Sequence, residues 1–127
     1  MSKLFLIIAA FNGMLAVMIG AFGAHALKEK LTPPLMAAYQ TGVQYHFYHL
    51  LALMLVAVLL MRWPGAYWLQ LSGYGFITGI ALFSGSLYLM AITGRRWLGA
   101  ITPIGGLMFI FAWIAMIMGV FYSVNNE

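Results

Sequence analysis

The residues of this chain that could do chemistry gather in one segment, residues 39–49, which reads YQTGVQYHFYH. Phenol, amide and imidazole groups donate and accept hydrogen bonds, and imidazole also binds metal ions. His46 and His49 are three residues apart, so they could share one face of a helix. The segment could therefore form a hydrogen-bond network, a ligand pocket or a metal site.

Polar residues outside that segment lack the partners that catalysis needs. A serine nucleophile requires a histidine that is oriented by an acid, and a hard metal site requires carboxylate ligands. The sequence contains two acidic residues, Glu29 and Glu127, and no cysteine. We therefore expect no enzymatic activity, no cofactor and no dedicated metal site. One alternative stays open, a histidine-ligated metal or haem site formed by His25, His46 and His49.

The elements that must position these groups are membrane-spanning helices. Only six Lys or Arg and two Asp or Glu occur among 127 residues, and the mean hydropathy is +0.98. Four uncharged stretches each exceed the roughly 20 residues that a helix needs to cross a hydrocarbon core of about 30 Å. We predict an all-α integral membrane protein, an antiparallel four-transmembrane-helix bundle that forms a single domain, residues 1–127. The predicted spans are residues 4–27, 36–61, 66–93 and 98–123.

Charges at the breaks between the spans predict the orientation in the membrane. Loops 28–34 and 94–97 carry four Lys or Arg, whereas the opposite side carries Lys3, Arg62 and the amino terminus. Because cytoplasmic loops are enriched in Lys and Arg, we expect both loops in the cytoplasm and both termini outside. The positive charges form no basic stripe, so we expect no nucleic-acid partner.

The first 26 residues share some features with a secretory signal, namely Lys3, an apolar run and the motif Ala24-His25-Ala26. The apolar run of about 20 residues is longer than the 7–15 residues that are typical of signal peptides. We therefore expect a first membrane span, with a signal peptide as the alternative.

Small residues recur at helical spacing in the first and third spans and predict close helix packing. Glycine, alanine and serine let helix backbones approach each other, which favours association in lipid. The same faces could form a homo-oligomer, and space for a ligand beside glycines such as Gly105 and Gly106 is an alternative. The small residues are Ala9, Gly13, Ala16, Gly20 and Ala24 in the first span, and Ser72, Gly75, Gly79 and Ser86 in the third.

At about 100° per residue, the second span separates a polar arc from an apolar face. Polar groups that face hydrocarbon lack hydrogen-bond partners, so we expect the arc to face the inside of the bundle. His46 lies just beyond the edge of the arc. The arc contains Thr41, Gln44, Tyr45, Tyr48, His49 and Ala52, and the apolar face contains Val43, Phe47, Leu50, Met54 and Val58.

Antiparallel connectivity brings other polar residues to the level of this arc. We predict a one-sided polar pocket in the membrane half next to loops 28–34 and 94–97. The opposite half holds fewer polar groups, Asn12 among them, and we expect it to be mostly dry. The candidate ligand-binding residues are His25, Gln40, Gln44, Tyr45, His49, Ser84, Ser86, Tyr88 and Thr102.

Three interpretations of this polar cluster stay open. It could be a buried hydrogen-bond network that sets helix register, a pocket for a lipid headgroup, quinone or other small amphiphile, or the metal or haem site. A small-molecule transporter is a further alternative, because His25 and His49 could titrate. Small multidrug exporters, however, use a membrane-embedded glutamate in the first span, where this chain has Asn12.

Four sequence blocks follow in order along nearly the whole chain: Gly20-Ala21-Phe22-Gly23-Ala24-His25, then Gln40-Thr41-Gly42 with Tyr45 and His49, then Leu82-Phe83-Ser84-Gly85-Ser86-Leu87-Tyr88, then Thr102-Pro103-x-Gly105-Gly106. Together they resemble the signature of the YgdD-like family of small, uncharacterised bacterial inner-membrane proteins. The resemblance implies a multi-pass protein of the bacterial inner membrane with no established biochemical activity. We expect a non-enzymatic accessory or lipid- or amphiphile-binding protein, with the lipid bilayer as its partner.

Overall fold

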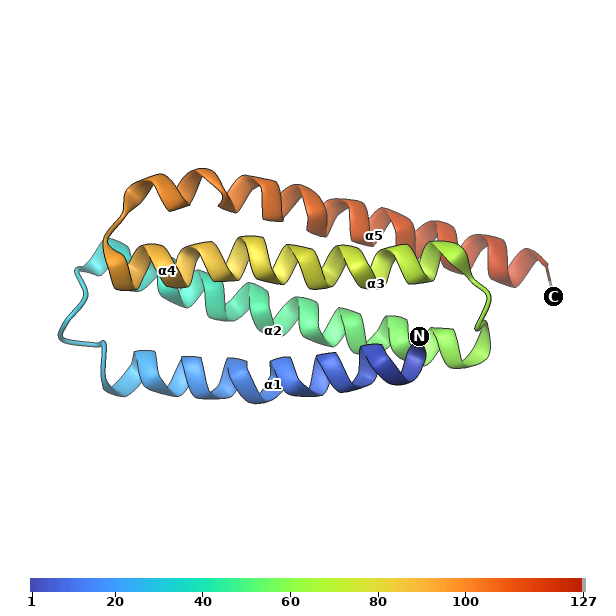
Figure 1. The fold of residues 1–127 in the computed structure, drawn as a ribbon, viewed down its shortest axis with the longest axis horizontal. Helices are drawn as coiled ribbons and strands as arrows, with labels where there is room; N and C mark the ends of the chain where they lie inside the picture. The colour runs from blue at the N-terminus through green and yellow to red at the C-terminus, as the bar shows by residue number, and fades with distance from the viewer. Residues whose placement is uncertain (127) are drawn as a thin grey trace.

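The computed structural model describes residues 1–126 as four long antiparallel helical spans joined by short loops (Figure 1). The first span is α1, Ser2–His25, and the second is α2, Pro33–Arg62. All four spans are long and apolar enough to cross a membrane, which confirms the predicted fold class. The predicted bounds differ from the observed ones by a few residues.

The third and fourth spans are each interrupted. The third consists of α3, Tyr67–Gly79, a π-helical segment η1, Ile80–Ser84, and α4, Gly85–Thr93. The fourth begins with a 3₁₀ turn, η2, Arg96–Ala100, and continues as α5, Thr102–Asn125. A π turn holds one more residue than an α turn, so η1 changes the faces that α4 presents relative to α3. The sequence pattern did not predict this segment.

Three prolines and one glycine mark the helix ends. Pro33 and Pro34 occupy the first turn of α2 and Pro103 that of α5, where a backbone N–H would have no intrahelical acceptor. α4 ends at Thr93 and is capped by Gly94, which has a φ of 70°. The N–H of Gly94 donates to the carbonyl of Met90 (2.9 Å). Glycine adopts this left-handed conformation without steric cost, so the helix ends there.

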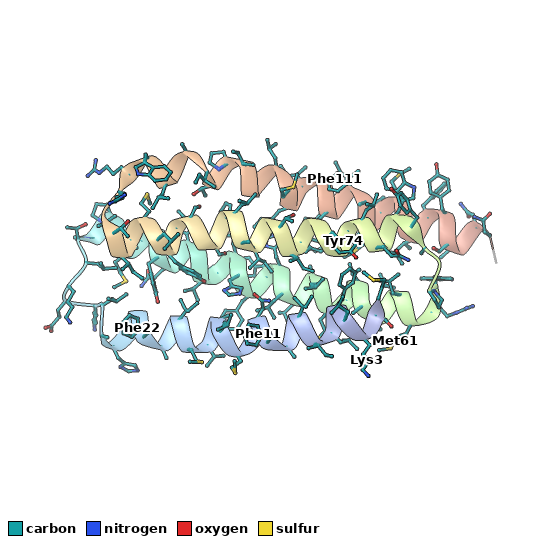
Figure 2. All side chains as sticks on the ribbon, viewed as in Figure 1. Lys3, Phe11, Phe22, Met61, Tyr74 and Phe111 are labelled. Carbon is teal, nitrogen blue, oxygen red and sulfur yellow. The ribbon has the colours of Figure 1, made fainter. Side chains whose placement is uncertain are left out.

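The four spans form two close pairs. α1 packs most closely on α2, α5 packs most closely on α3, and α2 joins the pairs by contacting the third span. In Figure 1 α1 and α5 therefore lie at opposite edges of the bundle. The outer surface is apolar, with Phe11 and Phe22 of α1 and Phe111 of α5 exposed (Figure 2). In a bilayer these faces would contact acyl chains.

Large side chains fill the core where they meet glycines on a neighbouring helix. The ring of Phe5 on α1 lies against Gly73 of α3, and the ring of Phe109 on α5 lies against Gly79. A Cβ placed on Gly75 would lie 2.8 Å from the Cβ of Ala112, so α3 and α5 approach too closely there for a larger residue. These glycines leave room for protein atoms of the neighbouring helices.

Most of the small-residue faces predicted from spacing are buried at such contacts, which confirms close packing. Ala24 is an exception, because it is exposed while the adjacent Gly23 is buried against the ring of Tyr39. The faces that were expected to form a homo-oligomer thus contact helices of the same chain. The buried members are Ala9 and Ala16 in α1, Ser72, Gly75 and Gly79 in α3, and Ser86 in α4.

Candidate functional site

A chain of hydrogen bonds crosses the centre of the bundle from α1 through α2 to α4. Nε2 of His46 lies 2.9 Å from Oδ1 of Asn12, and Nδ1 of His46 lies 3.0 Å from the hydroxyl of Tyr88. His46 is 3% exposed. We call Asn12, His46 and Tyr88 the central relay. It connects three of the four spans through one imidazole ring.

The direction of each hydrogen bond in the central relay follows from its neighbours. The Nδ2 amide of Asn12 donates to the carbonyl of Ile8 (2.9 Å), which leaves Oδ1 as an acceptor. Nε2 of His46 therefore donates to Asn12. In the neutral imidazole Nδ1 then carries no proton, so it accepts from the hydroxyl of Tyr88. This assigns the neutral Nε2–H tautomer to His46. A buried network whose members are all satisfied favours one arrangement of the helices that it joins.

Two buried serines from the predicted pocket also join spans. The hydroxyl of Ser84 donates to the backbone carbonyl of Gly42 in α2 (2.7 Å). The hydroxyls of Ser86 and Thr102 share a hydrogen bond of 2.6 Å between α4 and α5. These bonds connect the third span to its neighbours on both sides. Their geometry supports the interpretation of these residues as register-setting contacts.

His49 belongs to a separate aromatic cluster between α2, η1 and α5. Its Nδ1 donates to the backbone carbonyl of Tyr45 (2.7 Å), and its Nε2 accepts a hydrogen bond from the indole N–H of Trp113 (3.3 Å). The imidazole stacks on the ring of Phe109 with a centroid distance of 3.5 Å and an interplanar angle of 7°. Tyr45 stacks in turn on Phe83, with a centroid distance of 4.5 Å.

The three histidines are not brought together. His25 is exposed at the last residue of α1, whereas His46 and His49 lie deep within α2. Both ring nitrogens of His46 and both of His49 take part in hydrogen bonds within the protein. Across residues 1–126, no three His, Cys, Asp or Glu side chains are grouped so that they could hold a metal ion. The metal and haem alternative therefore has no support from the geometry.

The predicted inward arc of α2 is wrong in part. Gln44 is exposed and Tyr48 is 57% exposed, although both were expected inside the bundle. His46, expected beyond the arc, and Leu50, expected to face lipid, are buried. The reason is the position of α1, which covers the side of α2 that carries Leu50, opposite Gly13. A helical wheel fixes angles within one helix but cannot tell which side its neighbours cover.

The other predicted residues are distributed over several environments. Gln40 is exposed, Tyr45 is 38% exposed beside the aromatic cluster, and Tyr88 belongs to the central relay. Asn12 was expected in a mostly dry half, but its bond to His46 makes it part of the deepest polar contact. The sequence did contain a signal for this contact. Asn12 is the one polar side chain in the middle of its span, and it needs a hydrogen-bond partner at that depth.

The hollows on the surface of residues 1–126 include the following three. The first, which we call the α1–α2 cleft, has a volume of about 250 Å³ and is lined by Gly20, Gly23, Met36, Tyr39, Gln40 and Gln44 among others. The second, the α2–α5 groove, measures about 550 Å³ and is lined by residues from α2, η1 and α5, including Tyr45, His49, Phe83, Gly106 and Trp113. The third measures about 460 Å³ and lies at the opposite end, beside the turn at residues 62–68.

The α1–α2 cleft carries two amides that the protein leaves unsatisfied. Over residues 1–126, the side chains of Gln40 and Gln44 make no hydrogen bond with any protein atom. Gln70, near the other end of the bundle, does find a partner, because its Nε2 donates to the carbonyl of Pro64 (3.2 Å). Gln40 and Gln44 are four residues apart on α2, so both amides lie on one side of the helix.

Comparison with known proteins identifies similar chains in several bacteria. The family described as "Protein of unknown function (DUF423)" matches residues 19–106. The UPF0382 membrane protein YwdK of Bacillus subtilis (strain 168) is 46% identical over 116 residues, which cover 91% of this chain and 94% of the relative. The UPF0382 inner membrane protein YgdD of Escherichia coli (strain K12) is 38% identical over 118 residues, 93% of this chain and 89% of the relative. No solved structure matches the chain significantly.

Proposed function

We propose a function on the premise that this chain belongs to the DUF423 family, whose relatives are named as UPF0382 membrane proteins. The protein binds the polar head of an anionic phospholipid in the α1–α2 cleft, and it acts as a non-enzymatic accessory protein of the bacterial inner membrane. Membership of the family confirms the resemblance to the YgdD-like proteins. The names of the relatives state no biochemical activity, so the proposal depends on the geometry of the cleft.

The observation that carries the proposal is the pair of unpaired amides on Gln40 and Gln44. Placing an amide in an apolar medium without a hydrogen bond costs about 1–3 kcal/mol by protein mutational data. An exposed amide on a soluble protein finds water, but within hydrocarbon it needs a polar partner. A bound lipid can supply that partner through its ester carbonyl or phosphate oxygens, which accept hydrogen bonds from the amide N–H groups.

The depth of the Gln40 amide fits the glycerol region of a phospholipid. α2 contains 30 residues, which at 1.5 Å per residue is about 45 Å. A centred helix of this length extends beyond a hydrocarbon core of about 30 Å by roughly five residues at each end. Gln40 then lies just inside the hydrocarbon boundary, and Gln44 lies about 6 Å deeper along the helix. The ester and phosphate groups of the lipids lie at this boundary, whereas the hydrocarbon core of the bilayer contains no polar lipid groups.

The charges at this end of the bundle favour an anionic lipid. Lys28 and Lys30 lie in the turn between α1 and α2, and Arg95 and Arg96 lie at the end of the third span on the same side. Glu29 is the one acidic residue in these two loops. Juxtamembrane Lys and Arg contribute about 1 kcal/mol each to attraction by an anionic leaflet. Lys28 and Lys30 lie in the loop that joins the two helices of the cleft, and Arg95 and Arg96 lie at the same end of the bundle.

The excess of positive charge in loops 28–34 and 94–97 over the opposite side of the membrane also supports a proposed orientation. Loops 28–34 and 94–97 lie in the cytoplasm, where the anionic leaflet faces them, and both termini lie outside. The expected homo-oligomer through small-residue faces stays a prediction, and those faces already contact helices within the chain.

Mass spectrometry of retained lipids tests the proposal. We expect the wild-type protein, purified in a mild detergent, to retain phosphatidylglycerol in preference to phosphatidylethanolamine. The variant that combines Gln40→Leu with Gln44→Leu should retain several-fold less, because it removes both amides without adding bulk to the bundle core. Gln70→Leu is the matched control, since it removes an amide at the other end, and it should retain the wild-type amount. Equal lipid retention by the double variant and the control would overturn the proposal.

A further inference from the structure

The α2–α5 groove points to a second ligand of a different chemical class. We propose that this groove binds the head ring of a neutral isoprenoid quinone, with the isoprenoid tail lying along the outer surface of α5. The groove and the α1–α2 cleft have no lining residue in common, so this inference stands independently of the proposed function.

The walls of the α2–α5 groove are built from stacked rings. Tyr45 stacks on Phe83 at 4.5 Å with an interplanar angle of 29°, and His49 stacks on Phe109 at 3.5 Å with an angle of 7°. Tyr45 and His49 are themselves stacked, with an interplanar angle of 20°. His49 and Phe109 are 6% and 3% exposed, so the aromatic surface that is open to a ligand belongs to Tyr45 and Trp113, which are 38% and 42% exposed. A planar ring gains offset-stacking contacts on these two rings, whereas a flexible acyl chain gains no additional energy from them. The shape therefore favours a flat headgroup.

The groove runs from Pro103, in the first turn of α5, to Trp113, and its inner part beside Tyr45 and His49 disfavours charged headgroups. Tyr45 and His49 lie on either side of the midpoint of α2, each within about 4 Å of it along the helix axis. A phosphate or ammonium at the centre of a bilayer would be far from water and from the Lys and Arg residues of the loops. A quinone ring is uncharged, so it can occupy this depth. Its apolar tail matches the exposed side chains of Leu107 and Ile110 at the mouth of the groove.

Two polar groups of the groove, the hydroxyl of Tyr45 and the indole N–H of Trp113, can donate hydrogen bonds. The hydroxyl of Tyr45 makes no hydrogen bond with another group in residues 1–126. The indole N–H of Trp113 bonds to His49 at 3.3 Å, which is at the long end of the usual range and can be exchanged for a shorter bond. A quinone carries two carbonyl acceptors and no donor. The groove and the ring are therefore complementary, since the Tyr45 hydroxyl can donate to a quinone carbonyl.

The interruption of the third span helps to form the groove. η1 ends at Ser84, and the residue before it, Phe83, lies directly against Gly105 of α5. The next residue, Gly106, has no side chain, and a Cβ placed there would meet the ring of Phe83 only at 3.9 Å. Gly106 therefore leaves open space at the groove, and a larger side chain at this position would enter it.

Quenching of Trp113 fluorescence by a short-tailed ubiquinone tests the inference. Replacing Trp63, Trp68 and Trp97 by Phe leaves Trp113 as the only tryptophan. We expect decyl-ubiquinone to quench this parent variant saturably in detergent micelles, above the linear collisional background. Gly106→Leu should abolish the saturable component because it fills the groove. The matched control is Gly85→Leu, since a Cβ at Gly85 meets no atom within 4 Å, and it should bind like the parent.

Two further measurements keep the inference refutable if Gly106→Leu fails to fold. Tyr45→Phe retains the ring but removes the hydroxyl, and it should weaken binding about 3- to 10-fold. 1-Decanol supplies a tail without a ring, so it should not compete with decyl-ubiquinone at equal concentration. Quenching without saturation in the parent, equal affinity in Tyr45→Phe, or full competition by 1-decanol would each overturn the quinone assignment.

Discussion

Replacing His46 by leucine tests the central relay most directly. The change removes two hydrogen bonds between spans and leaves Oδ1 of Asn12 and the hydroxyl of Tyr88 without their partner. Hydrogen bonds between membrane helices contribute about 0.6 kcal/mol on average and up to about 1.7 kcal/mol. Two bonds therefore correspond to a loss of about 1–3 kcal/mol in the free energy of unfolding. Tyr88→Phe removes only one of them, so we expect a loss of about 1 kcal/mol.

The assay is unfolding in mixed micelles with increasing SDS, followed by the far-ultraviolet circular dichroism of the helices. Gln44→Leu is the control, because it also replaces a polar side chain of α2 by leucine but removes no hydrogen bond to the protein. We expect that control to unfold like the wild type in detergent. The relay also predicts coupling: combining His46→Leu with Asn12→Leu should cost less than the sum of the single losses, because both changes remove the same bond. A His46→Leu variant as stable as the control would show that the central relay does not stabilise the bundle.

Other predictions concern packing and orientation. Gly105→Ala should destabilise the bundle strongly, because its Cβ would overlap the backbone of Phe83, whereas Gly85→Ala should have little effect, since open space surrounds that position. Thermal unfolding of the two variants checks this, and equal stability would contradict the close approach of η1 and α5. For orientation, an alkaline phosphatase fused after residue 127 should be active and a green fluorescent protein fused there should be dark, because the carboxyl terminus is expected outside the cytoplasm. The opposite pattern would reverse the assignment of loops 28–34 and 94–97.

Several packing and site residues could be placed inside the bundle from the sequence, because their spacing along the helix indicated it. The small residues Ser72, Gly75 and Gly79 recur at helical spacing, and helices in lipid have few other means of close packing. Their burial in α3 follows that pattern. Ser84 and Ser86 were likewise expected inside the bundle, and both are buried there.

Other residues could not be placed, because their environment depends on a second helix. His46 lay outside the polar arc of its span, yet it is the residue that connects Asn12 to Tyr88. Gln44 lay inside that arc, yet it faces outward beside the α1–α2 cleft. Both errors have one cause: α1 covers a side of α2 that the periodicity of α2 alone does not identify.

By itself, the sequence determined that this protein has four apolar helices in a membrane, because a chain with so few charges has no other way to satisfy its backbone polar groups in hydrocarbon. That conclusion needs only local information, since every backbone hydrogen bond of a helix forms within its own segment. Which polar side chains meet was decided by the tertiary structure. The central relay, the π-helical segment η1 and the two clefts beside α2 depend on the rotation and depth of each helix relative to its neighbours, and these are set by packing across the whole bundle.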